Sequence, residues 1–106
     1  MAFDGNEDHE ISLKDAAVLT RNYREDAGEG GFLGGYFSKK ALMNILGQEN
    51  CVGIRIYNGK SASGDPSFVL VGVDPEGEDI TGGELAEYAL GCPPFCPKSS
   101  ELAGSA

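Results

Sequence analysis

Two cysteines near the C-terminus, Cys92 and Cys96, are the residues of this chain best suited to chemistry. A thiol–disulfide oxidoreductase uses the spacing C-x-x-C, with the first cysteine at a helix N-terminus that lowers its pKa. Here three residues intervene, and two of them are prolines, which lack the N–H groups that would stabilise a thiolate. The spacing therefore argues against an enzymatic redox pair.

A structural zinc site is the second chemistry to weigh, and it needs four ligands. Three would come from the cysteines Cys51, Cys92 and Cys96. The fourth would be His9, the only histidine, which lies in a polar N-terminal segment. A Cys92–Cys96 disulfide is a further alternative, but it would close a very short loop and a reducing cytoplasm would oppose it. We expect instead that prolines hold an extended tail whose thiols and Phe95 pack on the sheet, because free cysteine behaves as a small buried hydrophobe.

The remaining reactive residues form no catalytic pattern. Cys51 as a nucleophile would need a positioned base, and His9 is the one imidazole available. Carboxylates are plentiful, but no spacing singles out a pair. The run D-x-E-x-E at residues 74–78 fails as a calcium loop, because Asp79 occupies the glycine position and Leu85 the glutamate position. The sequence favours a protein that is not an enzyme and binds no cofactor, with zinc as the alternative.

The charge of the chain limits its partners. Eight basic residues stand against 17 acidic ones, a net charge of −9, which repels nucleic-acid phosphates and anionic membrane surfaces. No apolar run approaches the ~20 residues that span a bilayer. The first ten residues are acidic and lack the basic and apolar regions of a secretory signal. These features predict a cytoplasmic protein that binds neither nucleic acid nor membrane.

Two helices are expected in the first half of the chain. Ser12 can cap the first one, apolar residues follow at helical spacing to about residue 26, and Gly28 can supply a left-handed exit. Ser38 begins the second helix, and Gly47 is its natural C-terminal cap.

Between these helices lies a glycine-rich segment, residues 28–37. It matches neither G-x-x-x-x-G-K-[ST] nor G-x-G-x-x-G, so a phosphate-binding loop is not expected. Its apolar side chains would not remain in water, so the segment should tuck under the core or contact another chain. We predict Phe32, Tyr36 and Phe37 as binding residues.

After Cys51 the hydrophobic period changes from 3.6 to 2. Residues 52–57 predict a strand with Val52, Ile54 and Ile56 on its buried face, and a polar hairpin connection follows. Residues 68–73 are apolar on both faces and predict the better-covered central strand. A type I turn at residues 74–77 and a short strand at 78–80 come next. Residues 81–90 are ambiguous and could form one or two helical turns.

This order of elements predicts an α+β domain, with two N-terminal helices packed on a small antiparallel sheet of two to three strands and a proline-rich C-terminal tail. The domain should span residues 11–102, with flexible ends at 1–10 and 103–106. So small a sheet has exposed edges that favour self-association. On the outward face of the strand at residues 52–57, Arg55 beside Tyr57 would bind an anionic group or pair with a cross-strand carboxylate.

The last half of the chain resembles a group of small uncharacterised bacterial proteins. The resemblance rests on five stretches in order, namely Arg55-Ile-Tyr57-Asn-Gly59, Leu70 to Asp74, Gly77-Glu-Asp79 followed by Tyr88, Cys92-Pro-Pro-Phe-Cys96, and Ser100-Glu-Leu102. This resemblance implies no particular activity.

Two functions from different classes are compatible with these residues. The first is a non-catalytic interaction module that binds itself or another protein through its sheet edge, aromatic loop and proline-rich tail, with Phe32, Tyr36, Phe37, Arg55 and Tyr57 as binding residues. The alternative is a metal-binding or redox protein that uses Cys51, Cys92 and Cys96.

Overall fold

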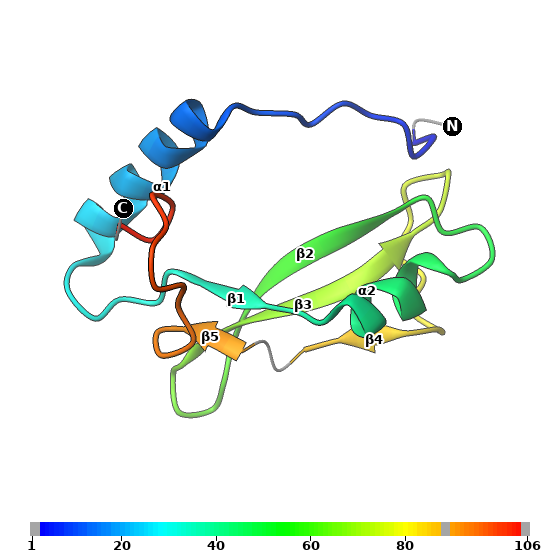
Figure 1. Ribbon diagram of the computed structural model, residues 1–106. Helices are drawn as coiled ribbons and strands as arrows, with labels where there is room; N and C mark the ends of the chain where they lie inside the picture. Colours follow the sequence, from blue (N-terminus) through cyan, green and yellow to red (C-terminus); the bar gives the residue numbers. More distant parts are fainter. Residues whose placement is uncertain (1–2, 88–89, 105–106) are drawn as a thin grey trace. The chain divides into compact units, whose positions relative to one another are not determined.

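The computed structural model describes residues 3–87 and 90–104, and it confirms the α+β class with two helices and two small antiparallel sheets in this part of the chain (Figure 1). The chain forms two compact units. The larger unit consists of Met1–Asp8 and Phe37–Ala89, and the smaller unit consists of His9–Tyr36 and Leu90–Ala106. Among the described residues, no helix is both long enough and apolar enough to cross a membrane.

Helix α2, Lys39–Leu46, lies in the larger unit. The hydroxyl of Ser38 accepts a hydrogen bond from the backbone N–H of Ala41 at 3.1 Å, so the predicted N-cap is confirmed. Ile45 is 1% exposed and lies against Gly72 of the sheet. The helix thus contributes one fully buried side chain to the core.

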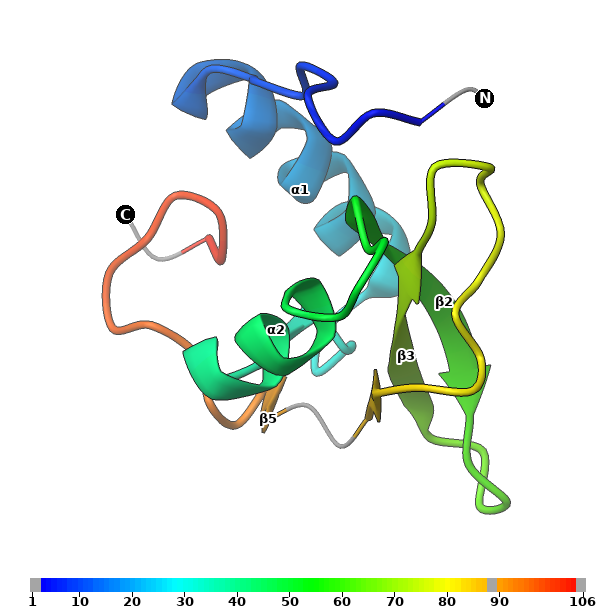
Figure 2. The same cartoon turned by 90° about the vertical axis from the view of Figure 1, so that its right-hand side faces the viewer.

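The larger unit contains a three-stranded sheet in the order β2-β3-β4, where β2 is Gly53–Lys60, β3 is Pro66–Val73 and β4 is Leu85–Ala86. Strands β2 and β3 form the expected hairpin over their full length (Figure 2). Strand β3 has a neighbour on each side, and the side chains of Leu70, Val71 and Val73 are buried. The prediction of a well-covered central strand is therefore confirmed.

One side chain of β2 departs from the predicted burial. Ile56 is 62% exposed, although its cross-strand partner Leu70 is buried. Strand β2 forms an edge of the sheet, and α2 covers the sheet at Gly72, which is the partner of Ile54. The alternating pattern identified the strand correctly but could not show that its edge position leaves Ile56 uncovered.

The segment after β3 is a tight turn. The carboxylate of Asp74 accepts hydrogen bonds from the N–H groups of Glu76 and Glu78 at 2.9 and 3.0 Å, and Gly77 adopts a φ of +82°. The short strand expected at residues 78–80 is reduced to a single bridge between Val73 and Asp79. Strand β4 instead provides the third strand.

In the smaller unit, helix α1 spans Leu13–Ala27. Ser12 Oγ accepts a hydrogen bond from the N–H of Asp15 at 3.0 Å, and Gly28 ends the helix with a φ of +80° while its N–H donates to Arg24 O. Both predicted caps are confirmed. No residue of α1 is buried.

The smaller unit also contains a two-stranded sheet, formed by β1, Gly34–Tyr36, and β5, Leu90–Cys92. The strands are antiparallel, with Gly34 opposite Cys92 and Tyr36 opposite Leu90. Part of the glycine-rich segment is therefore a strand rather than a loop, because it finds a partner more than fifty positions along the sequence.

Candidate functional site

Arg55 and Tyr57, both predicted as binding residues, meet at one carboxylate in the larger unit. They stand two positions apart on β2 and so face the same side of the sheet. Arg55 Nη1 donates to Asp79 Oδ1 at 2.6 Å and to Gly77 O at 3.2 Å. Tyr57 Oη donates to Asp79 Oδ2 at 2.5 Å. Of the two roles predicted for Arg55, the structure shows pairing with a carboxylate.

The electrostatics of this cluster follow from the shared carboxylate. The hydrogen bond from Tyr57 lowers the pKa of Asp79, the hydrogen bond and positive charge of Arg55 act in the same direction, and desolvation opposes them. The hydrogen bond to Asp79 raises the pKa of Tyr57 and also that of Arg55. Both side chains are therefore stabilised in their protonated forms. Their hydrogen bonds to Asp79 and to Gly77 O link the turn to β2.

The N-terminal segment adds an aromatic cover to this cluster. The Phe3 ring centroid lies 5.9 Å from Arg55 Cζ, within the range of a cation–π contact. The N–H of Phe3 donates to Pro75 O at 3.2 Å, and its ring lies against Gly77. Sequence reasoning missed Phe3 because an isolated aromatic in a polar segment carries no periodic signal.

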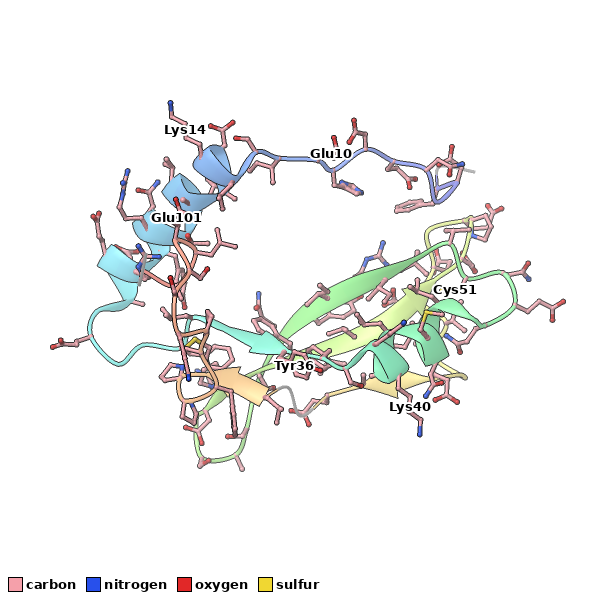
Figure 3. All side chains as sticks on the ribbon, viewed as in Figure 1. Glu10, Lys14, Tyr36, Lys40, Cys51 and Glu101 are labelled. Carbon is pink, nitrogen blue, oxygen red and sulfur yellow. A yellow bond between two sulfur atoms is a disulfide. The ribbon has the colours of Figure 1, made fainter. Side chains whose placement is uncertain are left out.

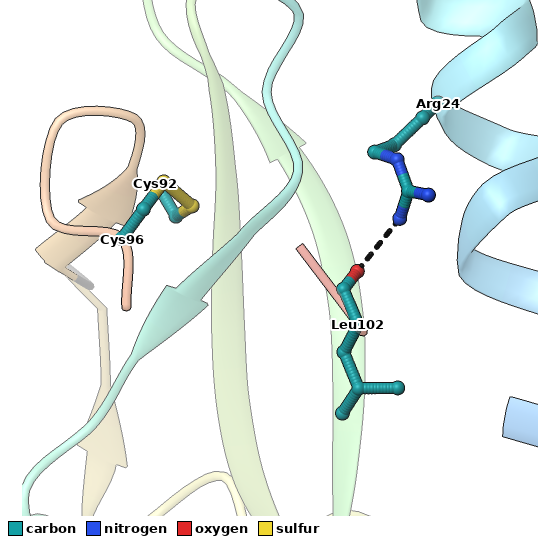
Figure 4. The surroundings of a disulfide bond; sticks show 4 residues. All are labelled: Arg24, Cys92, Cys96 and Leu102. Carbon is teal, nitrogen blue, oxygen red and sulfur yellow. Dashed lines mark hydrogen bonds between the residues drawn. A yellow bond between two sulfur atoms is a disulfide. The ribbon is translucent and has the colours of Figure 1, made fainter. Parts of the chain in front are cut away.

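In the smaller unit, Cys92 and Cys96 form a disulfide, with their Cα atoms 4.8 Å apart (Figure 4). The expectation that both are free thiols is wrong, and so is the packing of Phe95 on the sheet, because its side chain is 60% exposed. The segment folds back on itself, with the N–H of Phe95 donating to Gly91 O at 2.9 Å. This turn brings the two sulfur atoms together.

Cys51 is a free cysteine in the larger unit, and Figure 3 shows it beside the end of α2. Its thiol donates to Gly53 O at 3.2 Å. No group of three or more His, Cys, Asp or Glu side chains that could hold a metal ion is found in the described part of the chain. A disulfide sulfur is not a thiolate ligand, so zinc binding through Cys51, Cys92, Cys96 and His9 stays a prediction for the reduced protein.

A pocket of about 320 Å³ lies beside the disulfide, within the smaller unit. Arg24 and Glu29 are its charged residues, and glycine backbone forms much of the wall. Its full lining is Arg24, Gly28, Glu29, Gly30, Gly31, Leu33, Pro93 and Cys96. The sequence did not predict this pocket: the glycine-rich run was expected to pack or to contact another chain, and the contribution of Pro93 and Cys96 depends on β1–β5 pairing. A smaller pocket of about 210 Å³ lies along α1, with Leu19, Tyr23 and Arg24 in its wall.

The three predicted aromatic binding residues of the glycine-rich segment are divided between the units. Phe32 and Tyr36 belong to the smaller unit and Phe37 to the larger one. Phe32 is half-buried, with its ring against Gly91, and Phe37 is half-buried as well. Tyr36, which is labelled in Figure 3, is exposed. Tyr88, which forms part of the resemblance, lies outside the described residues.

Comparisons of the chain with protein-family models, with curated proteins and with solved structures found no match.

Proposed function

We propose that this protein is a small, non-catalytic interaction module that adds a strand at the open edge of β2. The observation that carries the proposal is the exposure of this edge. Strand β2 has eight residues and pairs with β3 alone among the strands of the described chain. Ile56 and Tyr57, in its middle, are 62% and 46% exposed.

An open edge of this kind supports strand addition for a physical reason. Its outward N–H and C=O groups can pair with another chain, and main-chain hydrogen bonds then supply affinity. Ile56 and Tyr57 are consecutive and therefore face opposite sides of the sheet. A docked strand would find an apolar neighbour on each face. In the smaller unit, the exposed pair Tyr36 and Leu90 offers a second apolar surface for the same purpose.

The partner is a second copy of the chain or another protein. A net charge of −9 on each copy opposes self-association, and added salt screens this repulsion. Self-association should therefore strengthen with salt, whereas binding to a basic partner should weaken. We further propose that the protein acts in the cytoplasm, away from nucleic acid and membranes, and that it groups with the small bacterial proteins it resembles.

The test compares Ile56→Lys with Met43→Lys, since Met43 is also exposed, at 58%, but lies on α2 rather than on the edge strand. Sedimentation velocity at tens of micromolar and two salt concentrations should show that Ile56→Lys dissociates the assembly and Met43→Lys does not. If the wild type is a monomer throughout, a photoreactive residue at position 56 should crosslink a partner that position 43 does not capture. Equal capture of a partner from positions 56 and 43 would refute binding at the edge of β2.

A second candidate function is favoured by the disulfide. A disulfide in a reducing cytoplasm is usually transient and redox-active. Cys96 is exposed and borders a pocket, so it is accessible to reactants. The zinc form of this candidate requires reduced cysteines. Elemental analysis of the reduced protein, with a thiol count before and after denaturation, tests it. Stoichiometric zinc supports the metal form, and three slowly reacting thiols without metal oppose it.

A further inference from the structure

We propose that the pocket beside the disulfide receives a low-molecular-weight thiol with an amino-acid head group, of which free cysteine is the simplest, and directs its sulfur to Cys96. This inference rests on the redox candidate above and is independent of the β2 edge. It makes Cys96 a site of reversible S-thiolation.

The two cysteines of the disulfide differ in exposure to solvent. Cys92 is 8% exposed and lies in β5, where its carbonyl accepts a hydrogen bond from the N–H of Leu33 at 2.7 Å. Cys96 is exposed and forms part of the pocket wall. Which sulfur of a disulfide is attacked depends on access. An incoming thiolate should therefore reach Cys96 and leave Cys92 as the departing sulfur.

The charged residues of the pocket match a zwitterionic head group. Arg24 and Glu29 are its two charged residues, one of each sign. A zwitterionic head group presents a carboxylate to the guanidinium and an ammonium to the other side chain. A guanidinium has five N–H donors, and the bond given to Leu102 O at 2.9 Å uses one of them (Figure 4). Arg24 is thus held in place by the C-terminal segment while it keeps donors for a ligand.

The volume of the pocket limits the size of the ligand. A volume of about 320 Å³ lies at the lower end of the range of small-molecule sites, about 300–1,000 Å³. Adding a Cβ atom at Gly28 or Gly30 would meet no neighbour within 4 Å, so the glycine backbone leaves this side of the site open. The space suits a compact thiol rather than a folded partner.

The chemistry balances without another reagent. The thiolate of the small molecule attacks Cys96 Sγ, a new S–S bond forms, and the Cys92–Cys96 bond breaks. Its electron pair leaves on Cys92 Sγ, which takes a proton from water. The products are a mixed disulfide on Cys96 and a buried thiol on Cys92. Reversal follows when the Cys92 thiolate attacks Cys96 Sγ and expels the small thiol.

The experiment measures the rate at which the disulfide of the oxidised full chain opens with increasing free cysteine. 2-Mercaptoethanol serves as the thiol without a head group. Samples are quenched with excess N-ethylmaleimide and mapped by mass spectrometry. We expect the rate to saturate with cysteine but to rise linearly with 2-mercaptoethanol, and the adduct to lie on Cys96. Arg24→Gln should slow the reaction with cysteine about threefold, the effect of one exposed charge pair, whereas Arg21→Gln on the same helix should not.

Three results would overturn the inference: an adduct on Cys92, a linear dependence on cysteine, or equal rates in Arg24→Gln and Arg21→Gln. Far-UV circular dichroism of both variants shows whether the fold is intact. The dependence of the wild-type opening rate on cysteine concentration needs no variant, so the test remains valid if Arg24→Gln misfolds. Dithiothreitol, a thiol without an amino-acid head group, tests the redox candidate separately from the pocket. If dithiothreitol opens the disulfide and cysteine does not, the pocket assignment fails and the redox candidate survives. If neither opens it, both fail.

Discussion

The substitution Gly72→Ala tests how tightly α2 is packed on the sheet. A Cβ atom at position 72 would lie 2.9 Å from Cys51 Sγ, 3.0 Å from Gln48 Nε2 and 3.4 Å from Ile45 Cγ2. Optimal separations between nonbonded carbon atoms are about 3.5–4.0 Å, so the two closest neighbours must move. Ile45 is fully buried and has no room to yield.

Gln48 is also held in place. Its Nε2 donates to Ile45 O at 2.9 Å, and its Oε1 accepts from the N–H of Glu84 at 2.8 Å. Moving this side chain would break a bridge between the end of α2 and the segment that leads into β4. Overpacking of such a site costs typically about 1–3 kcal/mol. For a unit of this size, each kcal/mol lowers the melting temperature by about 4–8 °C.

Gly53→Ala is the matched control, since Gly53 lies in the same hairpin and an added Cβ there has no neighbour within 4 Å. This change should be neutral or stabilise by up to about 1 kcal/mol, because alanine restricts the unfolded chain. Urea unfolding followed by far-UV circular dichroism gives both values. Cys51→Ala in the Gly72→Ala background should recover part of the loss by removing the closest neighbour. If Gly72→Ala is as stable as Gly53→Ala, the packing described for α2 is incorrect.

Further changes test the core, a helix cap, the carboxylate cluster and the disulfide. Ile45→Ala should cost about 2–5 kcal/mol in urea unfolding by leaving a cavity, and a cost under 1 kcal/mol would contradict its burial. Ser12→Ala should cost about 1 kcal/mol by removing the cap of α1, whereas Ser12→Asp should not. Because the pKa of Asp79 is lowered in the fold, its contribution is present above its ordinary pKa near 3.8 and is lost as the pH falls through the lowered value. Between pH 6 and pH 2, the free energy of unfolding should thus decrease less in Asp79→Asn than in the wild type. An identical decrease with pH in both proteins would refute the contribution of the Arg55–Tyr57–Asp79 cluster. Cys92 and Cys96 close a loop with a sequence separation of 4, so its reduction should cost no more than about 2 kcal/mol in the chain-entropy model, and global unfolding on reduction would show a larger role.

Local signals in the sequence were sufficient for the helix starts and the central strand. Ser12 and Ser38 each accept a hydrogen bond from an N–H three residues later, so the information lies within one turn. Leu70 and Val71 are consecutive, so they point to opposite faces of β3, and both are buried, as the unbroken apolar run predicts. These elements could be predicted because no distant residue decides them.

Features that depend on distant residues could not be predicted in the same way. Strand β1 exists because it pairs with β5, and the glycines within it carry no strand signal. The sequence does not distinguish Asp79 from the other carboxylates, because its contacts with Arg55 and Tyr57 depend on how the turn folds against β2. The short loop and a reducing cytoplasm argue against the disulfide, whereas the structure folds the proline segment back and brings the two sulfur atoms together.

The division of the chain has a consequence for biosynthesis. The smaller unit is assembled from two pieces, His9–Tyr36 and Leu90–Ala106, and the polypeptide between them belongs to the larger unit. The ribosome makes the last piece only after the whole larger unit has been translated, so β1 must wait for β5 while the β2–β3 hairpin already has both of its strands. A nascent chain that has left the ribosome only as far as residue 89 would contain all three strands of the larger unit but not β5, the partner of β1. We therefore expect the β2–β3 hairpin to form before the β1–β5 sheet during synthesis.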